Sequence, residues 1–155
     1  MIKKVRETSA DEVAYHVGIS QTIVTALRSL PYQAARGELA IPSDLMITHA
    51  IPSTYLFRPD NDSHKPALRD AVHDMASIAR YHLNQARALQ LNVPKSGRVT
   101  LLPAVGAELY LDKLEKVADF DVLHEELYIE KGGIGPQSII WHPLLLGRAW
   151  LTGVF

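Results

Sequence analysis

The strongest constraint on this chain is an apolar stripe within residues 66–91. Its members recur at three- and four-residue spacing, which places them on one face of a helix. The stripe consists of Leu68, Ala71, Val72, Met75, Ala76, Ala79, Leu83, Ala86 and Leu89. Pro66 suits a first helical turn, and Pro94 cannot continue a helix. The pattern therefore predicts a long amphipathic helix that begins near Pro66 and ends near Leu91.

A second helical pattern precedes this one. Its inward face is marked by Val17, Ile23, Val24, Leu27 and Leu30. Ser9 and Glu12 have the spacing of a capping box, in which a hydroxyl and a carboxylate satisfy the first N–H groups of a helix. Pro31 disfavours helical backbone at the preceding residue. We therefore expect a helix over residues 10–30.

Shorter helices are expected in four other places. Ser43 follows Pro42 and opens one helical segment, and Ser53 opens a further turn. Residues 100–116 form another helix, in which Pro103 either lies in the first turn or bends the chain. The apolar side of that helix comprises Leu101, Leu102, Val105, Leu109, Leu111 and Leu114. A last short helix is expected over residues 142–151.

Composition excludes several classes of protein. The chain has 155 residues, which is enough for one domain with a core, and its hydrophobic content is 47%. A formal net charge of −1 gives no electrostatic reason to expect a nucleic-acid partner. Cysteine is absent, so disulfides and zinc–thiolate sites are excluded. No stretch approaches the roughly 18 apolar residues of a transmembrane helix, and we recognise no signal or transit peptide.

Some titratable side chains invite a metal-site interpretation. They are Asp70, His73 and Asp74, together with His82. We favour the simpler interpretation, in which they solvate the outer face of the long helix. His16 is expected to be a surface or packing residue, because no second ligand lies one turn away. Asp119 and Asp121 lack the spacing that places two carboxylates on one helical face, so we expect a cap or turn there.

Residues 17–46 carry a family resemblance. A glycine, an arginine, an Arg-Gly pair and a Pro-x-Asp segment fall at the spacing of a known motif. The matching residues are Gly18, Arg28, Arg36, Gly37, Pro42 and Asp44. This pattern resembles the second half of the squalene/phytoene synthase family, all-helical enzymes that join two prenyl diphosphates. The resemblance implies an all-α fold, namely the C-terminal half of the squalene/phytoene synthase (isoprenoid synthase-like) helical fold.

The acidic residues of the family motif are replaced. Ser29 stands at the position of the first aspartate, and Tyr32 and Gln33 stand at the positions of the Glu-Asp pair. The enzymes need paired carboxylates because Mg²⁺ is a hard cation that bridges to diphosphate oxygens. Neutral side chains cannot replace them. We therefore expect no enzymatic activity, no catalytic residue, no metal and no cofactor.

A non-catalytic branch of the family is a closer match. Its equivalent stretch resembles Leu-Arg-x-x-Pro-Tyr-x-x-x-Arg followed by Leu-Pro-x-Asp; here Leu27 to Arg36 and Ile41 to Asp44 follow that pattern, with Pro31-Tyr32 as the specific feature. Members of this branch assist the assembly of respiratory complex I in mitochondria. The resemblance therefore implies protein partners in a large mitochondrial assembly, and a location in the matrix or on the matrix face of the inner membrane.

The resemblance also indicates which residues would line a vestigial pocket. They are Arg28, Ser29, Tyr32, Gln33 and Arg36. Such a pocket would be filled by side chains or would hold a lipid. A structural role is the alternative: Arg28 paired with a helix carboxylate, Tyr32 packed as a lid, and Arg36 bonded to loop carbonyls.

The resemblance covers only part of the synthase fold. We expect residues 1–155 to form a single partial domain that lacks the N-terminal half. Half of a helical shell exposes a larger apolar area than soluble monomers tolerate. A separately encoded N-terminal half, a second copy or the surface of a large assembly would have to cover it, and peripheral membrane contact is left open.

Three functions follow from these observations. The first is a non-catalytic assembly factor or accessory subunit of a mitochondrial complex, with complex I as the first candidate. The second is a permanent structural subunit of another large mitochondrial assembly. The third is one half of a split prenyl-diphosphate transferase, against which the replacements at Ser29 and Gln33 count heavily.

Overall fold

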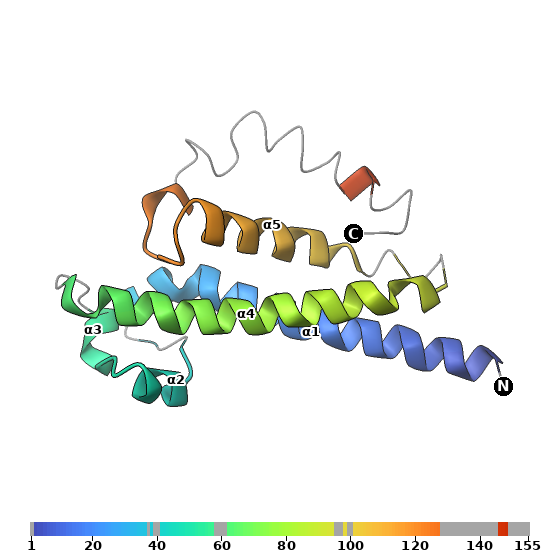
Figure 1. The fold of residues 1–155 in the computed structure, drawn as a ribbon, viewed down its shortest axis with the longest axis horizontal. Helices are drawn as coiled ribbons and strands as arrows, with labels where there is room; N and C mark the ends of the chain where they lie inside the picture. Colours follow the sequence, from blue (N-terminus) through green and yellow to red (C-terminus); the bar gives the residue numbers. More distant parts are fainter. Residues whose placement is uncertain are drawn as a thin grey trace.

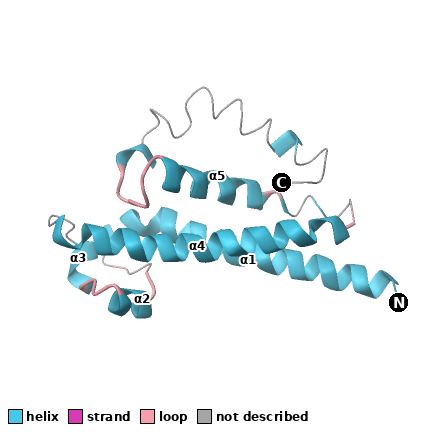
Figure 2. Ribbon diagram, viewed as in Figure 1, coloured by secondary structure: helices cyan, strands magenta, loops and turns pink. Residues whose placement is uncertain are grey.

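Every regular element of the described chain is helical (Figures 1 and 2). The computed structural model describes residues 2–36, 38, 41–57, 62–94, 98, 101–127 and 146–148. The helices are α1 (Ile2–Ala35), α2 (Ser43–Thr48), α3 (Ser53–Phe57), α4 (Lys65–Leu89) and α5 (Pro103–Lys116). Short 3₁₀ turns cover Asp62–His64, Gln90–Asn92 and Glu125–Leu127. The all-α prediction is confirmed.

The long helices α1 and α4 form the centre of the molecule. They run in opposite directions and cross, and α5 packs against both of them (Figure 1). α2 and α3 lie beside the end of the pair where α4 begins. The shared core contains several large side chains that are almost wholly buried: Leu27, Leu30, Leu68, Leu83, Leu111 and Leu114. All three long helices therefore contribute to one hydrophobic core.

The predicted limits of the first helix were wrong at both ends. α1 begins at Ile2, so Ser9 and Glu12 lie inside the helix and form no capping box. α1 also continues through Pro31 to Ala35. Proline removes one backbone hydrogen bond from a helix, but Leu30 and Ala34, one turn apart, are both buried. Packing of this last turn outweighs the local preference of the sequence.

The predictions for α4 and α5 are confirmed. Pro66 lies in the first turn of α4, and the predicted stripe is buried from Leu68 to Ala86, with Leu89 half-buried. Pro103 begins α5 and does not bend it. On α5 the small side chains Ala104 and Ala107 are more deeply buried than the predicted Leu109.

The turn after α5 has an unusual backbone. Asp119 and Phe120 both adopt positive φ, at 47° and 58°. This region favours glycine and disfavours bulky residues. The predicted turn is confirmed, because the Leu123 N–H donates to Asp121 Oδ1 at 3.0 Å. Of the helix expected over 142–151, residues 146–148 are described and are helical; the others lie outside the described residues.

Candidate functional site

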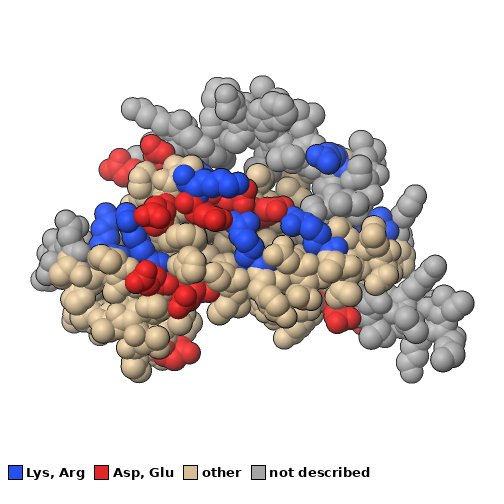
Figure 3. Space-filling model, in the orientation of Figure 1, with Lys and Arg blue, Asp and Glu red and all other residues tan. Residues whose placement is uncertain are grey.

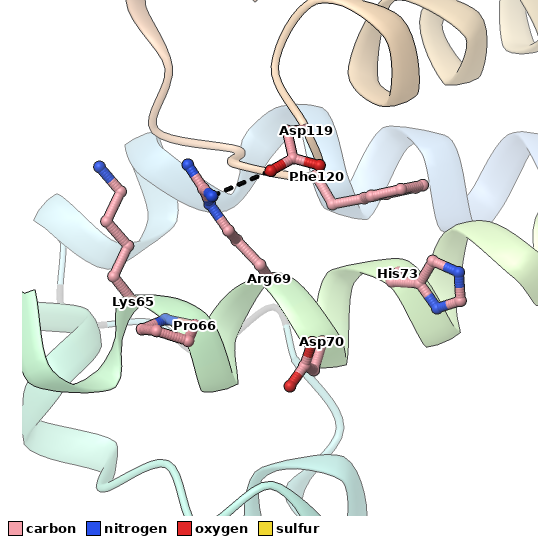
Figure 4. A pocket seen from close by; sticks show the side chains of 7 residues that line it. All are labelled: Lys65, Pro66, Arg69, Asp70, His73, Asp119 and Phe120. Carbon is pink, nitrogen blue, oxygen red and sulfur yellow. Dashed lines mark hydrogen bonds and ion pairs between the residues drawn. The ribbon is translucent and has the colours of Figure 1, made fainter.

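A hollow of about 530 Å³ lies where the start of α4 meets the turn after α5 (Figure 4). Its lining residues are Lys65, Pro66, Arg69, Asp70, His73, Asp119 and Phe120. The successive α4 residues face it because they are spaced three or four apart. We call this site the Arg69 hollow.

The cations of the Arg69 hollow already have carboxylate partners. Lys65 Nζ lies 3.1 Å from Asp121 Oδ2, and Arg69 Nη1 lies 3.0 Å from Asp119 Oδ2. Arg69 Nη2 is also 3.7 Å from Asp121, whose side chain is buried. With Asp70 on the wall, carboxylates balance the basic groups. The hollow therefore lacks the excess positive charge that would attract a phosphate or diphosphate.

One wall of the hollow is aromatic. The Phe120 ring meets the His73 ring edge to face, with centroids 4.8 Å apart. This contact holds the positive-φ turn against α4, since the backbone cost at Phe120 must be offset by its surroundings. His73 Nδ1 is also 3.5 Å from Asp74 Oδ1.

Asp74 connects α4 to the segment after α2. His49 Nε2 lies 2.8 Å from Asp74 Oδ2, and this hydrogen bond lowers the pKa of the Asp74 carboxyl. The carboxylate therefore lies between the rings of His49 and His73. Within the described residues, no three His, Asp or Glu side chains are placed to hold a metal ion.

A pair of histidines joins α1 to α4, and sequence reasoning missed it. His16 Nδ1 lies 2.7 Å from His82 Nδ1, so one ring donates and the other accepts. Burial lowers the pKa of His82, and the charge of His16 lowers it further. Edge-on rings of Tyr15 and Tyr81 flank the pair. His16 is thus a packing residue, as expected, but its partner lies 66 residues away.

The predicted pocket residues lie on the last turns of α1. The Arg28 guanidinium is 6.0 Å from the centroid of the Tyr110 ring on α5, which places it in a cation–π interaction with that ring. Ser29 Oγ donates to the Ala26 carbonyl at 3.0 Å. Tyr32 is 64% exposed, so it does not pack as a lid.

Tyr32 and Arg36 form a local pair one turn apart. Arg36 Nη1 donates to Tyr32 Oη at 2.7 Å, and Arg36 Nε is 3.8 Å from Glu38. The Gln33 carbonyl accepts the N–H groups of Arg36 and Glu38, which ends the helix. None of the five predicted residues lines the Arg69 hollow. A vestigial pocket at Arg28 and Tyr32 therefore stays a prediction.

Comparison with known protein families decides the relationship. Residues 1–132 match the family model described as squalene/phytoene synthase. The chain belongs to this family. The family is thus confirmed, whereas the prediction that residues 1–155 form one partial domain stays a prediction.

Three relatives show how widely the similarity extends. The chain is 36% identical over 135 residues to complex I assembly factor 6 of Rattus norvegicus, covering 87% of this chain and 39% of that protein. The Drosophila melanogaster homolog is 32% identical, covering 91% and 41%. The Dictyostelium discoideum homolog is 30% identical, covering 72% and 31%. The chain therefore spans about two fifths of the length of the rat protein.

No solved structure matches the chain significantly. Among the described helices, none is both long enough and apolar enough to span a bilayer.

Proposed function

We propose that this squalene/phytoene synthase relative is a non-catalytic protein that acts in the assembly of mitochondrial respiratory complex I through protein–protein contacts. One observation carries the proposal: 87% of the chain aligns with a relative named as an assembly factor of that complex. The finer part of the proposal places the protein in the matrix or on the matrix face of the inner membrane.

The side chains at the altered motif support a non-catalytic role. Mg²⁺ prefers carboxylate oxygens, which Ser29, Tyr32 and Gln33 do not supply. The Ser29 hydroxyl bonds within its own helix, and the Tyr32 hydroxyl accepts a bond from Arg36. These oxygens are thus engaged in local contacts. We propose that Arg28, Tyr32 and Arg36 line what remains of the family's substrate pocket.

The proposal is tested by deleting the gene in its native host and restoring it. We expect deletion to lower the amount of mature complex I on native gels and to raise the amount of its assembly intermediates, with the other respiratory complexes as internal controls. Normal complex I after complete deletion would overturn the proposal. If the protein were present in mature complex I at constant occupancy, it would be a permanent subunit and not an assembly factor.

A second experiment addresses catalysis. The purified protein, together with the partners that co-purify with it, is incubated with prenyl diphosphates and Mg²⁺. We expect no diphosphate release above that of the buffer. Mg²⁺-dependent turnover would contradict the non-catalytic assignment and favour a split transferase. Protease protection in intact and opened mitochondria tests the matrix location separately.

A further inference from the structure

The surface where α1 and α4 meet is covered at one end. Beside the start of α4, Met46, Ile51 and Tyr55 of the α2–α3 segment are buried, and His49 contacts Asp74 of α4 at 2.8 Å. α2 and α3 lie below this end of α4 in Figure 1. Nearer the N-terminus of α1, by contrast, several large side chains of the same two helices are exposed beside the buried face.

Large apolar side chains gather in that exposed part. Tyr15 is 62% exposed, Ile78 is 48% exposed and Tyr81 is 58% exposed. Both tyrosine rings lie against His82, with centroids 6.4 Å and 5.4 Å away, so they belong to one surface. Ile78 lies one turn before His82 on the same face of α4. We call this surface the open groove; its residues are Tyr15, His16, Ile19, Ile78, Tyr81 and His82.

Carboxylates mark both ends of the open groove. Glu12 lies one turn before His16 on α1. Asp74 lies one turn before Ile78 on α4; its carboxylate contacts His49 and His73 and is 45% exposed. The described basic residues of α4 face the opposite side, where they pair with carboxylates of α5 and its following turn; they are Lys65, Arg69, Arg80 and Arg87. Figure 3 shows this division: Lys and Arg atoms gather along the boundary of α4 and α5, whereas the described surface below them carries acidic and uncharged atoms.

We propose that the open groove binds an amphipathic helix of a partner protein, with an apolar face against Ile78 and the two tyrosines and with basic residues near its ends. Exposed apolar surface between polar rims is typical of a protein interface, and tyrosine is enriched at its energetic centre. From Glu12 to Ile19, the last residue of the open groove on α1, the helix rises about 10 Å, so a partner helix of about three turns is long enough to cover it.

Charge selects this occupant over two others. A second copy of the chain, bound by the same surface, would bring carboxylates at Glu12 and Asp74 near those of its partner. An anionic membrane would be repelled by the same groups. A basic helix is attracted by them. The inference rests on the proposed function only in that the chain works by binding proteins.

The first test uses a labelled helical peptide of about 12 residues, with leucine on one face and lysine elsewhere. A matched peptide carries glutamate in place of lysine. By fluorescence anisotropy with the full chain, we expect the lysine peptide to bind about tenfold more tightly or better. Ile78→Lys should weaken its binding about tenfold or more, whereas Leu91→Lys, at an exposed apolar residue outside the groove, should not.

A second variant separates charge from apolar contact. Glu12→Lys leaves the tyrosines and Ile78 in place, so we expect about threefold weaker binding of the lysine peptide and slightly tighter binding of the glutamate peptide. Circular dichroism spectra and melting curves show whether each variant is folded. Binding data count only for folded variants, and Tyr81→Ser provides a second apolar truncation if Ile78→Lys unfolds.

Several results would overturn the inference. If the two peptides bound equally well, Glu12 and Asp74 would not select a basic partner. Self-association in sedimentation that Ile78→Lys abolishes would identify a second copy as the occupant. Binding to cardiolipin-containing vesicles that Ile78→Lys abolishes would identify a membrane. If the Ile78→Lys variant restored complex I to the wild-type level in the deletion strain, only the role of the open groove would be refuted. If the wild-type gene failed to restore complex I, only the proposed function would be refuted.

Discussion

Helix α4 meets its two long neighbours in different ways. Toward α1 it presents leucines and alanines that are almost wholly buried, such as Leu83 and Ala79. Toward α5 it presents arginines. Arg80 pairs with both Asp112 and Glu115, at 2.9 Å and 3.0 Å. We call the first boundary the apolar seam and the second the ionic seam.

This difference suggests that the apolar seam supplies most of the stability, whereas the ionic seam fixes the register of α4 against α5. Burial is strong but has no direction, whereas a hydrogen-bonded ion pair fixes register and contributes little when exposed. On the ionic seam, Lys116 lies 2.6 Å from Asp112 and lowers the pKa of that carboxyl, and Arg80 lowers it further. The apolar seam should therefore dominate the free energy of unfolding.

The largest expected effect comes from the apolar seam. Leu83→Ala removes a buried side chain and leaves a cavity, so we expect a loss of about 2–5 kcal/mol in the free energy of unfolding, measured by urea denaturation. Ile47→Ala, at an exposed residue of α2, should change it by less than about 0.5 kcal/mol. If Leu83→Ala cost less than removal of an ionic-seam arginine, the comparison would fail.

The buried carboxylate after α5 should give the next largest effect. Asp121→Ala leaves Lys65 and the Leu123 N–H without their acceptor, so we expect a loss of about 1–3 kcal/mol. Asp119→Ala is the matched control: its side chain is 80% exposed, so its pair with Arg69 is worth less than about 1 kcal/mol. Equal losses for the two variants would show that burial does not decide the strength of these pairs.

The ionic seam itself should respond to salt. Arg80→Met keeps most of the aliphatic stem, so it tests charge more than packing. We expect a loss of about 0.5–1 kcal/mol at low ionic strength. The loss should nearly vanish in 1 M NaCl, where the Debye length is about 3 Å. The loss in free energy of unfolding caused by Leu83→Ala should not depend on salt in this way. If both losses fell equally in 1 M NaCl, the distinction between the two seams would be contradicted.

The smallest effect concerns pH at the edge of the apolar seam. Burial lowers the pKa of His82 below its ordinary value of 6.5, so the unfolded chain binds this proton more readily. The stability contributed by neutral His82 is complete above pH 6.5. It is lost as the pH falls from 6.5 toward the lower pKa of the folded state. Denaturation between about pH 7.5 and 5.5 should show a shallower decline for His82→Gln than for the wild type. Equal slopes would mean that the histidine pair is not linked to folding.

Much of the fold could be predicted because its determinants are local. The α4 stripe and the proline at its start specify a helix without reference to any other element. The Asp119–Asp121 turn could likewise be predicted from spacing, although the positive φ at Phe120 could not. That conformation depends on tertiary contacts, among them the ring of His73.

The limits of α1 show where local rules fail. Pro31 should end a helix, yet Leu30 and Ala34 continue the buried face beyond it. A proline costs one hydrogen bond and some strain, and the sequence alone does not reveal how much apolar surface the next turn buries. The capping-box pattern at Ser9 also failed, since α1 begins at Ile2 and Ser9 lies within the helix.

The candidate sites were predicted less well than the fold. The replaced motif residues Ser29, Tyr32 and Gln33 could be read from the sequence, but their contacts could not. His16 and His82 meet only because of the register between α1 and α4, which no local pattern specifies. The cluster around Asp74 drew attention as a metal site, whereas its strongest contact is to His49 on a different segment.

The length of α4 has a mechanical consequence. The open groove and the Arg69 hollow lie on different parts of this one helix, which rises about 37 Å over its 25 residues. A rigid rod pivoting by about 5° at one end moves its other end by about 3 Å. Such a displacement exceeds the tolerance of an ion pair. If a partner bound in the open groove tilted α4 by this amount, the ion pairs at the turn that holds Asp119 and Phe120 would therefore be disturbed.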